Sequence, residues 1–119
     1  MPIHSHKERE TFYIVKGQLE AFKDGSWQTY GVGTVCDVPG GMKHAWRNVS
    51  GESASTLVVM EMRLARFFRS VARPVASVPP GPPSSEVLQR FVQASLAEGH
   101  WLGNAADNAA IGINLMSFN

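Results

Sequence analysis

The chain has 119 residues, enough for one hydrophobic core and too few for two independent ones. Hydrophobic residues make up 44% and charged residues 18% of the chain, a balance typical of a globular domain that argues against disorder. Eleven lysine and arginine residues against ten aspartate and glutamate residues give a formal net charge of +1 without an extended basic stripe. We therefore expect no nucleic-acid partner.

Short stretches rich in β-branched and aromatic residues recur over residues 1–62, separated by turn residues. Asp24-Gly25 supplies the left-handed backbone of a tight hairpin turn, and Pro39-Gly40-Gly41 cannot lie inside a sheet. No helical periodicity interrupts these stretches, so an antiparallel barrel or sandwich is expected. The predicted strands cover residues 11–15, 19–22, 27–30, 35–38, 44–48 and 56–62.

The single cysteine, Cys36, cannot form an internal disulfide and indicates a reduced intracellular protein. It lies in a predicted strand, where it suits the role of a small buried side chain, and no motif of a nucleophilic cysteine surrounds it. The N-terminus carries no basic and apolar signal segment, and no stretch is long and apolar enough to span a bilayer. The expectation is a cytoplasmic protein that does not contact membranes.

The pattern changes after residue 62. Arginines recur at intervals of three to four residues, which predicts the solvated face of a short helix at Arg63, Arg66, Arg69 and Arg73. Residues 74–83 are rich in proline and favour an extended, semi-rigid linker. Ser84 or Ser85 can cap the helix that follows, and Gly99 can end it. The apolar face of that helix is formed by Val87, Leu88, Phe91, Val92, Ser95 and Leu96.

These features divide the chain into a β-core over residues 1–73, a proline-rich linker over 74–83, and a C-terminal helix and tail over 84–119. We expect the helix to pack on the β-core or on a partner subunit. Residues 104–119 are rich in alanine, asparagine and glycine, and are expected to form a loosely docked tail.

Three potential metal ligands lie close together near the N-terminus. In a strand, residues i and i+2 point to the same face, so His4 and His6 present two imidazoles side by side. A turn over residues 7–9 places Glu10 at the start of an antiparallel strand, where it can face the same interior. Imidazole and carboxylate groups are both ligands for divalent metal ions.

A fourth potential ligand, His44, follows the Pro39-Gly40-Gly41 turn, which reverses the chain and can direct this side chain into the same interior. Three imidazoles and one carboxylate would leave two positions of a six-coordinate ion for water, dioxygen or substrate. The alternative is that these histidines form only a polar interior network. The remaining histidine, His100, is expected to be a surface or packing residue and not a ligand.

These residues resemble the two conserved motifs of the cupin superfamily. The first motif has His-x-His, three or four residues, Glu, six residues and Gly, and is matched by His4, His6, Glu10 and Gly17. The second motif has Gly, five residues, Pro, any residue, Gly, two residues, His, three residues and Asn. It is matched by Gly33, Pro39, Gly41, His44 and Asn48. The resemblance covers about residues 1–62, and residues 67–69 with the proline-rich linker resemble the tails of small quercetin-dioxygenase-like cupins.

The resemblance implies an all-β fold, an antiparallel jelly-roll β-barrel of the cupin type, here followed by a C-terminal helix. It also implies one divalent metal ion, held by His4, His6, Glu10 and His44. This ligand set suits iron, manganese, nickel, copper, cobalt or zinc without selecting among them. A metal-dependent dioxygenase or related enzyme for a small oxygen-bearing aromatic is favoured, with Glu10 as ligand or as catalytic base. The alternative is a non-catalytic small-molecule-binding or storage-like module.

The chain departs from the family pattern at its N-terminus. The first motif normally begins with a glycine before the first histidine and follows one or more strands, whereas His4 is only three residues after Met1. We therefore expect the N-terminal strands to be missing, which leaves an open sheet edge at which His4 can fray. A second protomer could cover that edge, so a homodimer is expected, with the metal end of the first strand near the interface.

Strand alternation predicts the surroundings of the metal. If Glu10 faces inward, Phe12 and Ile14 share its face, and Trp46 shares the face of His44. In the strand over residues 56–62, Val58, Met60 and Met62 are preferred as the inward set over Leu57, Val59 and Glu61 because the former are wholly apolar. The predicted pocket for a small apolar ligand is lined by Phe12, Ile14, Met42, Trp46, Val58 and Met60. The alternative is that these residues fill the core.

Overall fold

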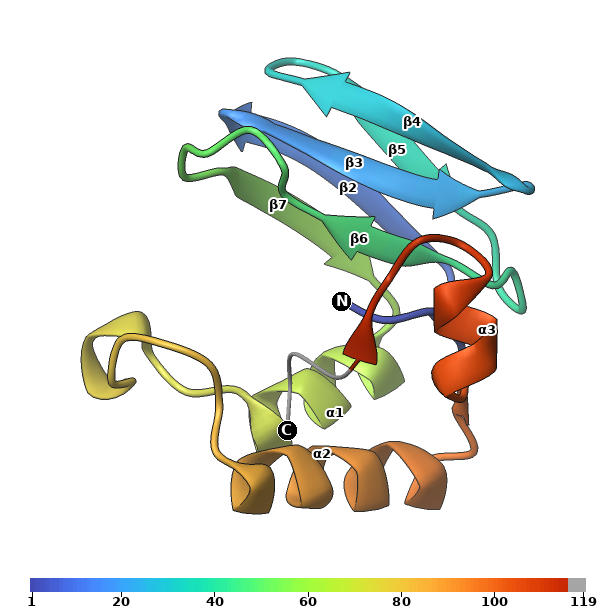
Figure 1. Cartoon of the computed structure of the whole chain (residues 1–119), viewed down its shortest axis with the longest axis vertical. Coiled ribbons are helices and arrows are strands. Elements are labelled where there is room, and N and C mark those ends of the chain that lie inside the picture. Colours follow the sequence, from blue (N-terminus) through green and yellow to red (C-terminus); the bar gives the residue numbers. More distant parts are fainter. Residues whose placement is uncertain (116–119) are drawn as a thin grey trace.

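The computed structural model describes residues 1–115, in which two antiparallel three-stranded sheets face one another above a layer of helices (Figure 1). One sheet has the strand order β5-β2-β7, and the other has the order β4-β3-β6. The strands are β2 (Glu10–Lys16), β3 (Gln18–Lys23), β4 (Ser26–Gly31), β5 (Val35–Val38), β6 (Ala45–Arg47) and β7 (Ser55–Met60). The predicted antiparallel strands are confirmed, and their bounds differ from the predicted ones by at most two residues.

Residue alternation places the core between the two sheets. In β2, Glu10, Phe12 and Ile14 are buried and Tyr13 and Val15 are exposed, as a strand with one face on a core requires. Strands β3 and β4 are joined at the predicted hairpin turn, where both turn residues have a positive φ. Side chains from both sheets make one apolar cluster of Phe12, Ala21, Cys36, Val38 and Trp46, which confirms Cys36 as a buried packing residue.

The N-terminal segment is held on both sides. Strand β1 (His4–Ser5) pairs antiparallel with β8 (Trp101–Leu102) near the other end of the chain. On its other side, the backbone N–H of His4 donates to His44 O (3.0 Å), and the N–H of His44 donates to His4 O (2.9 Å). The expectation that this edge is open and that His4 frays is therefore wrong, because the chain's own β8 covers β1. The described strands form three separate sheets, so the predicted closed barrel is open here.

Three α-helices follow the sheets, where the sequence predicted one C-terminal helix and one short arginine-bearing helix. Among the described residues they are α1 (Met62–Val71), α2 (Ser85–Ala97) and α3 (Ala105–Ala109), and a 3₁₀ turn covers Val75–Ser77. The serine at position 84 caps α2 by accepting from the N–H of Val87. Among the described residues, no helix is long and apolar enough to cross a membrane.

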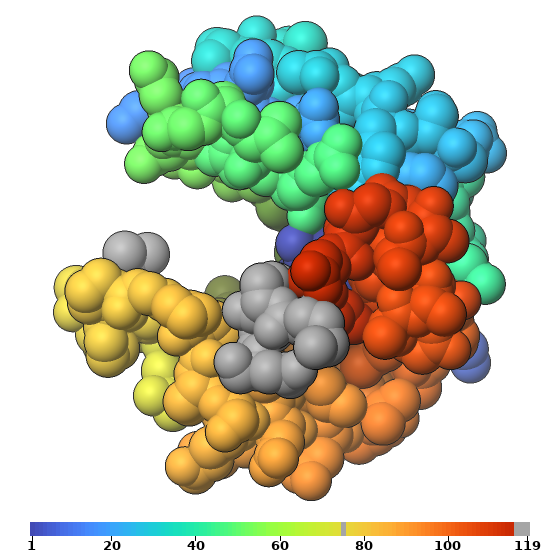
Figure 2. Space-filling model, in the orientation of Figure 1, coloured from blue at the N-terminus to red at the C-terminus, as the bar shows by residue number. Residues whose placement is uncertain are grey.

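Helix α1 replaces the end of the strand predicted over residues 56–62. Leu64 and Phe67 are buried on one side of α1, whereas Arg63, Arg66 and Arg69 are exposed, which confirms the solvated arginine face. The helices lie across the N-terminal segment from the two sheets, and the surface is hollowed between the sheets and the residues that connect α1 to α2 (Figure 2).

The residues after β8 are firmly docked, which contradicts the expected loose tail for residues 104–115. Asn104 and Asp107 cap α3 reciprocally. Asn108 is fully buried, and its Oδ1 accepts from the backbone N–H of Ile3 (2.9 Å). Because Trp27 Nε1 also donates to the carbonyl of Ile111 (2.8 Å), this segment joins the N-terminal strand to the β4-β3-β6 sheet. Residues 116–119 of the predicted tail lie outside the described residues.

Candidate metal centre

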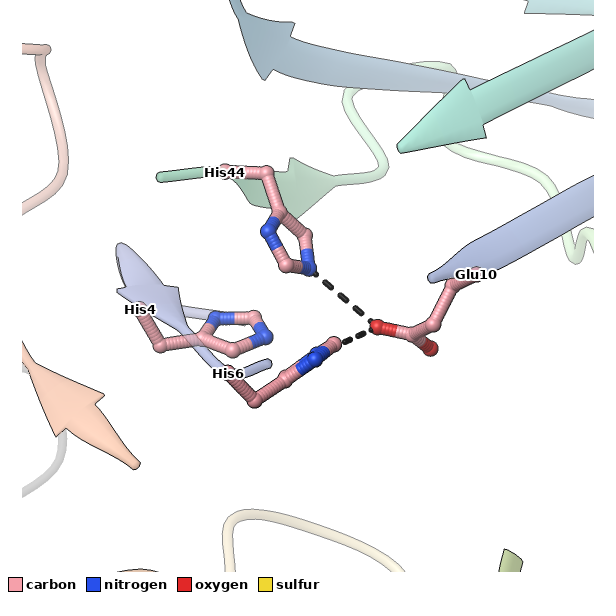
Figure 3. A group of neighbouring side chains, drawn as sticks. All are labelled: His4, His6, Glu10 and His44. Atoms are coloured by element: carbon pink, nitrogen blue, oxygen red, sulfur yellow. Dashed lines mark hydrogen bonds and ion pairs between the residues drawn. The ribbon is translucent and has the colours of Figure 1, made fainter. Parts of the chain in front are cut away.

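The four predicted ligands come together at one buried centre (Figure 3). His4 lies on β1, His6 follows it directly, Glu10 begins β2, and His44 directly precedes β6. All four residues are at least nine-tenths buried. One ligand atom from each lies within 4.8 Å of the others. Strand pairing thus unites two ligand groups that are separated by more than thirty residues of sequence.

Backbone carbonyls set the same ring orientation in all three histidines. In each ring Nδ1 lies within hydrogen-bond distance of a carbonyl oxygen two residues away, so that Nδ1 donates and Nε2 is directed toward the shared centre. Such an outer hydrogen bond fixes the tautomer that a metal ligand requires. The accepting carbonyls are those of Pro2 for His4 (2.8 Å), Glu8 for His6 (2.9 Å) and Met42 for His44 (2.8 Å).

The carboxylate of Glu10 links two of these rings, because its Oε1 lies 2.6 Å from His6 Nε2 and 3.3 Å from His44 Nε2. Burial alone would raise the pKa of Glu10, but hydrogen bonds from His44 and His6 outweigh it and lower the pKa to about 2. Glu10 is therefore ionised at neutral pH and carries the negative charge that would offset part of a cation's charge.

The histidines differ in their readiness to lose a proton. Burial, together with repulsion from His44, lowers the pKa of His4 to about 3, so its imidazole is neutral at any ordinary pH. Burial would also lower the pKa of His6, but the hydrogen bond and charge of Glu10 outweigh it and raise this pKa. A proton on His6 Nε2 and a metal ion would compete for one lone pair.

The geometry of these four residues fits a metal ion. Two ligands at ~2.1 Å from one ion lie at most ~4.2 Å apart. The ligand atoms here lie within 4.8 Å of one another, which is close to that limit. Three imidazole nitrogens and one carboxylate oxygen suit a first-row divalent ion. His4, His6, Glu10 and His44 can therefore hold one.

The second-motif turn is positioned by close backbone contact with the loop that carries His6. The N–H of Gly41 donates to His6 O (2.7 Å). A Cβ atom on Gly40 would lie 2.1 Å from Lys7 O, so only glycine permits this approach. This contact holds the ligand-bearing loop and the turn before His44 at a fixed separation.

Sequence reasoning missed the residues that tie this loop to the helices. Glu8 is buried, and its carboxylate oxygens lie 3.8 Å from His6 Nδ1 and 3.8 Å from Arg63 Nε on α1. Arg63 in turn lies 3.3 Å from the carboxylate of Glu98 at the end of α2. His100 is also buried, with its ring 5.4 Å from that of His6, and it lies outside the ligand cluster, as the sequence predicted. Burial lowers the pKa of His100, and the charge of His6 lowers it further.

The six residues predicted to line a pocket mostly lie between the sheets. Phe12 and Trp46 stack with ring centroids 4.4 Å apart, and Met42 and Val58 pack against the same apolar cluster. Ile14 is fully buried, and Met60 is half-buried opposite Glu10. The predicted inward set is confirmed for Val58 and Met60, because Leu57 and Val59 of the alternative set are exposed. It is wrong for Met62, which lies in α1 and is exposed. Contact of these side chains with a substrate stays a prediction.

Two facing antiparallel sheets with a buried cluster of three histidines and one glutamate define a β-fold with a candidate metal centre. Residues 1–60 match the family model described as a cupin domain, which is half of the chain, and the chain therefore belongs to the cupin family. A similar solved structure is a Cupin 2 conserved barrel domain protein from Salinispora arenicola CNS-205, with 24% sequence identity and a TM-score of 0.45. The match covers 55% of this chain and 56% of that chain, so this chain spans little more than half of that protein. No curated protein matches the chain.

Metal affinity is expected to depend on pH through His6. Its pKa is raised above 6.5, and a metal ion binds only the unprotonated ring. Below that pKa, affinity should fall at least about tenfold per pH unit, because the metal ion must displace the proton on His6 Nε2, and above it this dependence should disappear. His4, with a pKa of about 3, stays neutral throughout this range. Titrations with Zn²⁺ in non-coordinating buffers on both sides of neutrality measure this, and a flat profile on the acid side would contradict it.

Proposed function

We propose that this cupin is a metal-dependent enzyme, a dioxygenase or a related enzyme, that acts on a small oxygen-bearing aromatic molecule. The observation that supports the proposal is the convergence of three histidine Nε2 atoms and one ionised carboxylate on a buried point. A divalent ion held there would supply Lewis-acid or redox chemistry. Four protein ligands leave part of a six-coordinate shell for a substrate.

The protein's own residues orient the candidate ligands and offset part of the charge of a bound cation. The backbone carbonyls hold three rings with Nε2 directed toward the shared centre, and Glu10 keeps its negative charge in a buried site. A carboxylate with a pKa of about 2 is a weak base, so we assign Glu10 first as a ligand. The catalytic-base role requires that His6 and His44 cease to donate to Glu10, as they must when their Nε2 atoms bind an ion.

A non-catalytic binding or storage-like module is the alternative, and it requires the same ligand cluster. Oxygen uptake separates the two functions. The purified protein is analysed for metals, an anomalous-scattering map identifies the element, and uptake is then measured with a flavonol such as quercetin. Uptake that requires both metal and flavonol supports the enzyme, and EDTA-treated protein is the control. Tight flavonol binding without uptake supports the module, and protein that binds none of the six candidate metals contradicts both.

A homodimer also remains a proposal, on a surface other than the predicted β1 edge. The outer face of the β5-β2-β7 sheet exposes five neighbouring apolar side chains, which a second copy would cover. Sedimentation velocity over a range of protein concentrations tests this, and a monomer at every concentration would contradict it. The exposed side chains are Tyr13, Val15, Val35, Leu57 and Val59.

A further inference from the structure

A cavity of about 330 Å³ lies on the helix side of the metal centre, away from the pocket that the sequence predicted between the sheets. Its walls come from the N-terminal segment, from α1 and α2, and from β8. Two of the ligand histidines, His4 and His6, form part of the wall. Most of the remaining wall belongs to residues after position 60, outside the part of the chain that matches the cupin family. This volume is at the lower end of the range found for small-molecule sites.

A row of aromatic rings leads along this cavity away from the metal centre. The ring of His6 lies 5.4 Å from that of His100, which lies 4.7 Å from Phe67. Phe67 on α1 lies 6.1 Å from Phe91 on α2. All four rings belong to residues that line the cavity. Such walls favour a flat apolar ligand, because aromatic rings pack on one another edge-to-face or offset.

The polar groups of this cavity differ in whether they already have hydrogen-bond partners. Ser95 Oγ donates to Phe91 O (2.8 Å), and the Nδ1 atoms of His4 and His6 are bonded to backbone carbonyls. Neither ring nitrogen of His100 has a hydrogen-bond partner among the described residues, and neither is completely buried, so a ligand in the cavity can reach them. The imidazole of His100 is therefore suited to bind a hydroxyl or carbonyl group of a ligand.

The charge of the walls limits the ligand further. None of the described residues that line the cavity is an aspartate, glutamate, lysine or arginine. Met1 also lines the cavity, but its α-ammonium already donates to Trp46 O. A carboxylate on the ligand body would be buried there without a charged side chain to pair with it, which is unfavourable. An uncharged body is therefore favoured.

We propose that this cavity binds the substrate, and that the substrate is an uncharged aromatic with hydroxyl or carbonyl oxygens at one end and an apolar body. The oxygen-bearing end lies toward His100 and the metal ligands, and the apolar body lies between α1 and α2. That the ligand is a substrate rests on the proposed function. The C-terminal helices, and not the space between the sheets, then determine substrate specificity.

Binding to metal-free protein tests the cavity separately from the metal chemistry. The binding of 4-propylcatechol is compared with that of 3,4-dihydroxybenzoate in the presence of EDTA. The two compounds share one oxygen-bearing head, and the first carries an apolar substituent where the second carries a charged one. Calorimetry should show that 4-propylcatechol binds at least about tenfold more tightly. Equal affinities, or tighter binding of the carboxylate, would overturn the proposal whether or not the protein binds metal.

Two substitutions on α2 locate the binding site. Val92 lines the cavity, and Val92→Trp should fill it and weaken 4-propylcatechol binding at least about tenfold. Val87 has a similar exposure on the same helix but is not among the lining residues, so Val87→Trp should leave the affinity unchanged. His100→Phe should weaken binding about threefold to tenfold through the lost hydrogen bond. Unchanged affinity in Val92→Trp, or an equal loss in Val87→Trp, would overturn the proposal. If the protein binds no metal, only the claim that the ligand is a substrate fails, and the binding site itself is still tested by these variants.

Discussion

Replacing His44 with alanine should lower metal occupancy at least about tenfold, because the protein loses one of four candidate ligands and no further described residue belongs to the cluster. His44 is 1% exposed, and its Nε2 atom faces Glu10, so the substitution removes nitrogen from the middle of the cluster. The measurement is the metal content of purified protein by mass spectrometry, together with a Zn²⁺ titration of the metal-free protein.

The fourth histidine of the chain provides the matched control for this prediction. His100 is buried and close to His6 but lies outside the ligand cluster, so His100→Ala should retain the metal content of the unmodified protein. Circular dichroism must show that both variants keep their β-structure. Full occupancy in His44→Ala, or an equal loss in both variants, would contradict the ligand assignment.

Replacing Gly40 with alanine should destabilise the fold by about 2 kcal/mol or more and weaken metal binding with it. The added Cβ would lie 2.1 Å from Lys7 O, so the Pro39-Gly40-Gly41 turn must move away from the loop that carries His6. That movement strains the 2.7 Å hydrogen bond from Gly41 to His6 O. Urea denaturation of the metal-free protein measures the stability, and metal titration measures the second effect.

Gly31 is the matched control for the glycine substitution. A Cβ atom at Gly31 meets nothing within 4 Å, and this residue lacks the positive φ that would strain an alanine. Gly31→Ala should therefore change stability by no more than about 0.5 kcal/mol. If Gly40→Ala were as stable as Gly31→Ala, the backbone contact would not be what holds the two ligand-bearing segments together.

Most of the sheet structure and all four ligands could be predicted, because both depend on local signals. The alternation of Phe12 and Ile14 with exposed neighbours defines a strand by itself, and Asp24-Gly25 defines its own turn. The ligand set follows from the spacing of His4, His6, Glu10 and His44 within two motifs. Physical reasons for that spacing appear only in the structure, as with the close contact between Gly40 and Lys7.

The features that could not be predicted depend on contacts between distant segments. Strand β8 consists only of Trp101 and Leu102, which is too short to show a periodic pattern, so no local signal indicates that it pairs with β1. The buried position of His100 follows from that pairing. The apolar alternation predicts that Met62 belongs to a strand, but Met62 instead begins the helix that buries Leu64 and Phe67, with Glu61 at its N-cap.

The pairing of β1 with β8 has a consequence for how the protein matures in the cell. His4 is synthesised well before its strand partner Leu102, which follows 98 positions later in the chain. The two sheets can assemble while translation continues, but the N-terminal ligand pair gains its final support only afterwards. Contacts between segments so far apart in sequence form slowly. Metal capture should therefore be a late, post-translational event, and a nascent chain arrested before residue 101 should hold the ion weakly.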